Sequence, residues 1–166
     1  MIIRPEASED AEILFTLTQR AFSQMPYSDG SEGRILNDLR SDGDLTLSLV
    51  AEDGGTIVGH VAFSPVRIND IDRGWFGLGP ISVAPERQRE GIGRKLVDAG
   101  LSILEQRGAS GCALIGDPAL YSKLGFRCNK RLTYGEVPPE VVQFKTLSGQ
   151  DPEGQLTFAP AFDPKP

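Results

Sequence analysis

The sequence predicts one α/β domain in which a mixed, mostly antiparallel sheet is flanked by helices. Its 166 residues are enough for a single domain with a substantial core. Short β-prone runs alternate with stretches whose apolar residues recur every three or four positions, a spacing typical of amphipathic helices. An aspartate and two glycines at residues 53–55 separate two apolar runs, which indicates a hairpin and therefore antiparallel pairing.

The N-terminal part predicts one strand and two helices. Residues 2–3 form a short strand that Pro5 closes, because proline lacks the backbone donor that a strand ladder needs. The first helix follows Ser8 or Asp10, either of which can cap it. A polar connection then leads to Ser31, which begins the second helix.

Three strands follow, linked mostly by hairpins. Residues 45–52 and 56–65 form the first hairpin. We expect residues 67–72 to extend its second strand as far as a turn near residues 73–74. Residues 75–83 then return as the next strand.

The C-terminal half begins with a long amphipathic helix from Ile92, which ends at Gly108 because glycine readily adopts the left-handed conformation of a helix end. Residues 112–115 form a short apolar strand. Asp117 and Pro118 begin a short helix, since aspartate caps and proline suits the first helical position. The remaining predicted features are a helix stop at Gly125 and strand-like segments at residues 141–147 and 156–158.

Composition narrows the class of protein. With 39% hydrophobic and 24% charged residues, the chain is not of the disordered or membrane type. A net charge of −6 argues against nucleic acid as the main partner. Cys112 and Cys128 have no metal-site spacing, and the N-terminus lacks the apolar run of a signal peptide, so we expect no metal and a cytoplasmic location. Monomer and homodimer both remain open.

The turn before the long helix carries the strongest chemical signal. A strand, a glycine-bearing turn and a helix N-terminus in succession form an anion site. A P-loop pattern is absent, and a dinucleotide fingerprint fails because Leu96 stands where a third glycine is needed. Residues 85–95 hold four cations and two anions, which favours a phosphate-rich ligand over glycines that merely ease a turn. The cations are Arg87, Arg89, Arg94 and Lys95.

Two segments carry a resemblance to a known family. The run Gln88-Arg89-Glu90-Gly91-Ile92-Gly93 resembles the pyrophosphate-binding motif Q/R-x-x-G-x-G/A of the GNAT acetyltransferases. Residues 114–126, LIGDPALYSKLGF, resemble the late strand-helix segment of that family, in a form similar to one subgroup of predicted N-acetyltransferases. The resemblance spans about residues 2–147 and implies a domain of residues 1–147, and residues 148–166 form a proline-rich extension that can add an edge strand.

The resemblance implies a single-domain GNAT fold whose sheet is splayed at an acetyl-CoA site. It also implies an enzyme that moves the acetyl group of acetyl-CoA to a primary amine by direct attack in a ternary complex. The backbone N–H of Val83 is the implied group that polarises the thioester carbonyl. The cofactor-binding residues that the resemblance implies are Ile81, Ser82, Val83, Arg87, Gln88, Arg89, Glu90, Gly91, Ile92, Gly93 and Arg94.

The catalytic candidates are Tyr121 and His60. Tyr121 matches a family tyrosine near the sulfur, and a phenol can protonate a departing thiolate; the alternative is a tyrosine that only packs. His60 is the only histidine and titrates near neutrality, so it is the candidate general base, although it can equally be a hydrogen-bonded structural residue. Glu52 and bulk water are weaker candidates for the base, and Ser64 is a candidate for lining the acceptor pocket.

Two other functions stay open at this stage. A non-catalytic, CoA-binding regulatory domain agrees with the lack of a carboxylate at residues 77–79, where family members often carry a glutamate. An acyltransferase that uses a longer acyl-CoA needs the same turn. We expect no cysteine nucleophile, because Cys112 lies in an apolar strand and Cys128 has no base near it in the sequence.

Overall fold

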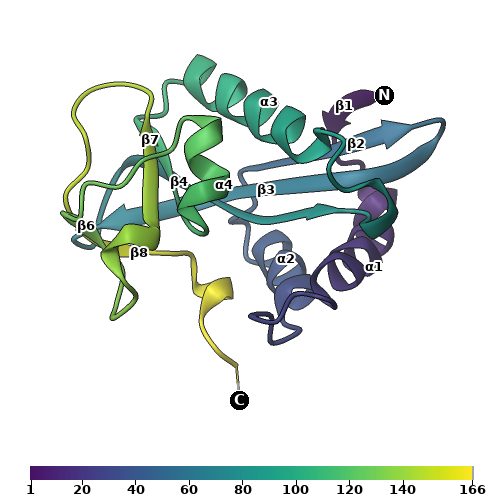
Figure 1. Ribbon diagram of the computed structural model, residues 1–166, viewed down its shortest axis with the longest axis horizontal. Helices are drawn as coiled ribbons and strands as arrows, with labels where there is room; N and C mark the ends of the chain where they lie inside the picture. Colours follow the sequence, from purple (N-terminus) through teal and green to yellow (C-terminus); the bar gives the residue numbers. More distant parts are fainter. Residues whose placement is uncertain (166) are drawn as a thin grey trace.

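A hairpin of two long strands forms the centre of the structure, a computed structural model that describes residues 1–165 (Figure 1). The two strands are β3 (Thr56–Ile68) and β4 (Ile71–Val83). The other elements are β1 (Ile2–Pro5), α1 (Ala11–Phe22), α2 (Glu32–Ser41), β2 (Leu47–Asp53), α3 (Ile92–Gln106), β5 (Gly111–Ile115), α4 (Pro118–Tyr121), β6 (Leu132–Thr133), β7 (Val142–Thr146) and β8 (Gly154–Thr157).

The strands form one mixed sheet in the order β1-β2-β3-β4-β5-β7. Neighbours from β1 to β4 are antiparallel, β5 is parallel to β4, and β7 is antiparallel to β5. β8 pairs with the end of β3, and the short β6 pairs with β8. The predicted fold class, a mostly antiparallel mixed sheet flanked by helices, is confirmed.

The predicted turn near residues 73–74 is wrong, because the chain reverses four residues earlier. Asn69 and Asp70 have φ angles of 52° and 63°, and Ile68 pairs with Ile71. Asparagine and aspartate tolerate this left-handed region better than other non-glycine residues, so they form the tight turn. Residues 71–72 consequently belong to β4 and not to β3.

Two layers of helices cover the sheet, with α3 on one face and α1 and α2 on the other (Figure 1). Leu96, Val97 and Leu101 of α3 are buried against the first face. Leu14 of α1 and Leu36 of α2 are buried against the second. Full burial of one such side chain stabilises the fold by about 1.5–3 kcal/mol.

The sheet opens between β4 and β5. Their parallel pairing runs only from Trp75 with Gly111 to Gly77 with Ala113. Beyond Gly77, β4 continues to Val83 beside β3, while the rest of β5 pairs with β7. Among the described residues, one edge of β4 therefore has no neighbouring strand over its last residues, just before the turn into α3.

The C-terminal segment packs on the helical face that carries α1 and α2. Leu156 of β8 is buried in a core cluster, and Ala159 and Ala161 lie against α2. The ring of Phe158 lies 3.0 Å from the position that a Cβ at Gly77 would take. A domain boundary at residue 147 stays a prediction. Within the described residues, no helix is long and apolar enough to cross a membrane.

Candidate active site

The free edge of β4 presents backbone groups to the opening. The N–H of Ala84 donates to the carbonyl of Val58 at 2.9 Å, so it points toward β3. Successive N–H groups of a strand point in opposite directions, and the N–H of Val83 therefore points away from β3, toward the opening. The side chains of Ile81 and Val83 pack on the core beneath α3, which leaves their backbone to serve a ligand.

The turn into α3 is shaped as a cradle for an anion. Gly91 has a φ angle of 84°, which only glycine adopts without strain. The first helical bond runs from the N–H of Lys95 to the carbonyl of Gly91 at 3.1 Å, so the N–H groups of residues 92–94 have no helical partner. A Cβ at Gly93 would meet only ordinary contacts of 3.7 and 3.8 Å, so the fold itself leaves room for an alanine there.

The charges of this turn are divided between paired and free groups. Arg87 donates to Asp53 at 2.9 Å and to Glu90 at 3.0 Å, and these hydrogen bonds raise its pKa. Arg94 lies 3.9 Å from Asp98 in an exposed pair. Within residues 1–165, Arg89 and Lys95 are exposed and take part in no ion pair. These two cations are therefore available to a phosphate.

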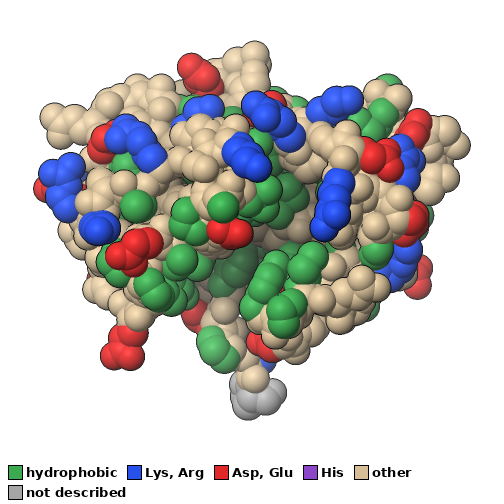
Figure 2. Space-filling model, in the orientation of Figure 1, with side chains coloured by type: hydrophobic (Ala, Val, Ile, Leu, Met, Phe, Trp, Pro, Cys, Tyr) green, Lys and Arg blue, Asp and Glu red, His purple; other side chains and the backbone are tan. Residues whose placement is uncertain are grey.

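The opening is visible as a hollow near the centre of the face in Figure 2. Hydrophobic side chains border the hollow, and Lys and Arg side chains gather above it and to its right, over α3 and the turn before it. Such a surface suits a ligand with an apolar part and an anionic part.

Tyr121 is the last residue of α4, next to the end of β5. Asp117 caps this helix by accepting from the N–H of Ala119 at 2.9 Å. The Tyr121 ring lies over Gly116, where a Cβ would come within 2.6 Å of it, and makes an edge contact with Phe126. Burial raises the pKa of the Tyr121 phenol to about 12, so the group keeps its proton at neutral pH.

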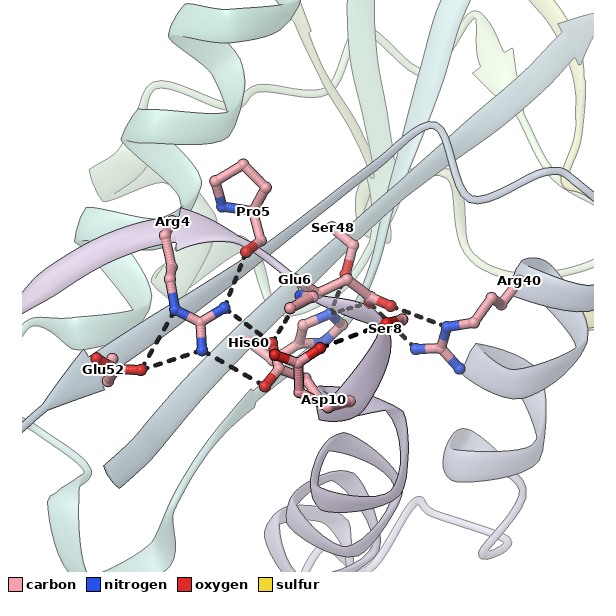
Figure 3. A network of polar contacts seen from close by, with 11 residues as sticks. Arg4, Pro5, Glu6, Ser8, Asp10, Arg40, Ser48, Glu52 and His60 are labelled. Carbon is pink, nitrogen blue, oxygen red and sulfur yellow. Dashed lines mark hydrogen bonds and ion pairs between the residues drawn. The ribbon is translucent and has the colours of Figure 1, made fainter. Parts of the chain in front are cut away.

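His60 is buried on the face of the sheet under α1, in a polar network (Figure 3). Its side chain has no exposed surface, and its Nε2 lies 2.7 Å from Oγ of Ser48. Burial lowers the pKa of His60 to about 4, so the ring is neutral at physiological pH. The role of general base stays a prediction, which the complete burial disfavours.

Two further candidates are Glu52, for the general base, and Ser64, for the lining of the acceptor pocket. Glu52 accepts from Arg4 at 3.0 Å, near the edge of the sheet that β1 forms. Ser64 is fully buried opposite Gly77, and its hydroxyl has no hydrogen-bond partner among the described residues. Ser64 is therefore buried where β4 still pairs with β5, and Glu52 lies near the β1 edge of the sheet.

The sequence patterns missed the groups that surround His60. Glu6 comes from the β1–α1 connection, Ser48 from β2 and Arg40 from α2. Each is an ordinary surface-type residue in the sequence, and only folding brings them together.

Cys112 is fully buried, which raises the pKa of its thiol and makes it a poor nucleophile. The described residues contain no group of three or more His, Cys, Asp or Glu side chains that could hold a metal.

Comparisons with known proteins agree with this geometry. The sequence profile of the acetyltransferase (GNAT) family matches residues 11–126. An Escherichia coli (strain K12) relative named "Uncharacterized N-acetyltransferase YhbS" is 42% identical over 127 residues, which cover 76% of this chain and 73% of the relative.

Two solved structures are similar over almost the whole chain. A GNAT family acetyltransferase from Brucella melitensis in complex with acetyl-CoA is 42% identical, with a TM-score of 0.88 over 98% of this chain and 97% of that one. YhbS from Escherichia coli in complex with CoA is 33% identical, with a TM-score of 0.89 over 97% of this chain and 91% of that one. The profile match, the sequence identity and the shared fold show that the chain belongs to the GNAT acetyltransferase family.

Proposed function

We propose that the protein is an N-acetyltransferase that moves the acetyl group of acetyl-CoA to a primary amine within a ternary complex. The free edge of β4 beside the turn into α3 is the observation that carries this proposal. The turn offers unpaired N–H groups and the cations of Arg89 and Lys95 to the pyrophosphate, and β4 offers its backbone to the pantetheine arm. The two similar structures, solved with acetyl-CoA and CoA, support the same cofactor.

The chemistry requires one bond to form and one to break. The amine nitrogen attacks the thioester carbonyl carbon, the carbon–sulfur bond breaks, the nitrogen loses a proton and the sulfur gains one. The N–H of Val83, which points into the opening, stabilises the carbonyl oxygen as negative charge develops on it. A single donor of this kind is worth about 10²–10³-fold in rate.

The Tyr121 hydroxyl is the proposed proton donor to the leaving sulfur. Burial raises its pKa to about 12, so the hydroxyl carries its proton at neutral pH and can donate it to the sulfur. We assign no side chain as the general base. The proton of the attacking amine leaves through water, because His60 is buried and Glu52 is paired with Arg4.

Release of free thiol from acetyl-CoA, measured against a panel of primary amines, tests this proposal. We expect amine-dependent release with at least one class of amine, and N-acetylated product in equal amount. A Gly93→Asp variant is the control, since it keeps a permitted backbone and places a carboxylate where the pyrophosphate would bind. Thiol release without acetylated product would be hydrolysis and would contradict the transfer reaction.

A non-catalytic CoA-binding domain is the second candidate. The observation that favours it is that residues 77–79 of β4, Gly-Leu-Gly, carry no carboxylate. Tight acetyl-CoA binding with no thiol release across the amine panel would select this candidate. Release from a longer acyl-CoA, but not from acetyl-CoA, would keep the transferase and change its acyl donor.

A further inference from the structure

A buried polar pair without hydrogen-bond partners lies beneath α1, on the face of the sheet opposite α3. Among the described residues, Nδ1 of His60 and Oγ of Ser82 have no partner, although both side chains are buried. Buried polar groups are almost always hydrogen-bonded, since a buried group without a partner loses its hydration and gains nothing in return. Each of these two atoms therefore calls for a physical explanation.

The contacts of Glu6 fix which nitrogen of His60 carries the proton. Arg40 donates to both carboxylate oxygens of Glu6, at 2.9 and 3.1 Å (Figure 3). Burial alone would raise the pKa of Glu6, but the hydrogen bonds from Arg40 and Ser48 lower it, so Glu6 is ionised. An ionised carboxylate only accepts, and Ser48 must therefore donate its single hydroxyl proton to Glu6.

The proton of the imidazole ring of His60 is fixed in the same way, by its contact with Ser48. Because the proton of Ser48 is used on Glu6, the contact of 2.7 Å between Ser48 and Nε2 of His60 needs its proton from the imidazole. His60 is therefore the Nε2–H tautomer, and its Nδ1 is a lone pair that needs a donor. The neutral state of the ring agrees with this, since a doubly protonated imidazole has no lone pair.

Ser82 is placed to supply that donor. It lies directly opposite His60 in the pairing of β3 with β4, and both side chains are buried on the same face. Opposite residues of an antiparallel pair have Cβ atoms about 4.5–5.5 Å apart. The two atoms are not in hydrogen-bonding geometry with each other, so a change of the Ser82 χ1 rotamer or one internal water joins them.

We propose that Ser82 directs its hydroxyl proton to Nδ1 of His60, directly or through one water, and that the chain Ser82–His60–Ser48–Glu6 positions β4 at the acetyl group. Ser82 stands between Ile81 and Val83, whose backbone serves the thioester in the proposed function, and the inference rests on that function. At this point β4 has a neighbouring strand on one side only. A side-chain link to β3 therefore fixes the strand where the free edge leaves it least supported. His60 and Ser82 are positioning residues, since neither touches the substrate.

The sole histidine allows a direct test on the ¹⁵N-labelled full chain. His60 gives the only imidazole signals in a two-bond ¹H–¹⁵N spectrum. We expect the Nε2–H tautomer from pH 6 to pH 8, and a downfield shift of Nδ1 in Ser82→Ala because the lone pair loses its donor. Ser64→Ala, another buried serine with no partner, is the matched control and leaves both signals unchanged. An Nδ1–H tautomer, or an Nδ1 shift that Ser82→Ala does not alter, would overturn the proposal.

Kinetics test the positioning role. We expect Ser82→Ala to lower kcat about 10- to 100-fold, because small misplacements of reacting groups cost about this much, with the Kd of acetyl-CoA changed less than about twofold. Ser82→Thr keeps the hydroxyl and restores most of kcat. Equal kcat in wild type and Ser82→Ala, or failure of Ser82→Thr to restore activity, would contradict positioning through the hydroxyl.

The two proposals can fail separately. If wild type binds acetyl-CoA but transfers nothing, the proposed function fails, and the His60 signals still report on β4. Acetyl-CoA should then shift these signals in wild type and not in Ser82→Ala. The same shift in both proteins would contradict the link between the network and the cofactor strand.

Discussion

Two regions meet along the last residues of β4, and they are built from different parts of the chain. On the edge that faces β5, the proposed site consists mainly of backbone groups of one segment, from Val83 through the turn to residue 94, with Tyr121 of α4 as its one distant residue. On the face beneath α1, the network consists of side chains from the β1–α1 connection, β2, β3 and α2. Backbone groups tolerate changes of side chain, whereas the buried network depends on the identity of each residue.

The comparison predicts that the largest effect on activity comes from the open side. Tyr121→Phe keeps the ring over Gly116 and removes only the hydroxyl. We expect turnover to fall about 10²–10⁴-fold, the usual worth of a general acid, with the affinity for CoA almost unchanged. Single-turnover thiol release measures this. Near wild-type turnover in a step limited by chemistry would mean that water protonates the sulfur.

The largest effect on stability should come from the buried side and should depend on pH. The pKa of His60 is about 4 in the folded protein and near the ordinary value of 6.5 in the unfolded chain. As the pH falls, His60 therefore binds its proton in the unfolded state before it does so in the folded state. The contribution of His60 to the free energy of unfolding is present above pH 6.5 and is lost as the pH falls toward 4. Wild type should lose about 2 kcal/mol more than His60→Gln between pH 7.5 and pH 5.

Urea unfolding at a series of pH values measures this difference. Parallel stability curves for wild type and His60→Gln would show that His60 is not buried in its neutral form. Enzyme activity gives a second view of the same residue. Because the ring stays neutral, we expect the pH profile of His60→Gln to run parallel to that of wild type from pH 6.5 to pH 9. A selective loss near pH 6.5–7 would restore His60 as the general base.

The contrast also explains what the sequence could predict. The turn at residues 88–93 is contiguous, and its glycines mark backbone needs that are visible in the sequence. The fold class, the long helix and the hairpin at residues 53–55 depend on equally local patterns, and all three are confirmed. The network could not be predicted, because Ser48 and Glu6 lie 42 positions apart, and Arg40 and Glu6 lie 34 apart. His60 alone, with no partners in view, was indistinguishable from a catalytic histidine.

An intermediate effect should appear at the helix N-terminus. Gly93→Asp keeps a permitted backbone, and its Cβ meets only ordinary contacts, but it brings a carboxylate to the proposed phosphate position. We expect CoA affinity to fall at least about tenfold, or ~1.4 kcal/mol. Gly93→Ala is the matched control for bulk. Gly91→Asp should also weaken CoA, but its positive φ adds backbone strain and makes it less specific. Unchanged affinity in a folded Gly93→Asp variant would remove the turn from the site.

The smallest predicted effect is that of the exposed arginines on CoA affinity. It tests whether a cation in the turn acts locally on the ligand or only through the net charge of the protein. Arg89 is exposed in the turn, and Arg73 is exposed at the other end of β4; neither forms an ion pair among residues 1–165. Arg89→Gln and Arg73→Gln change the net charge equally. We expect Arg89→Gln to weaken CoA about fivefold, or ~1 kcal/mol, at low salt, and Arg73→Gln to change it less than about twofold. Raising the salt concentration should close the gap, since screening shortens the reach of an exposed charge to about 3 Å at 1 M. Titration calorimetry at two ionic strengths measures this. Equal effects of the two variants would mean that the turn acts through its backbone alone, and that the cations there contribute only to the overall field.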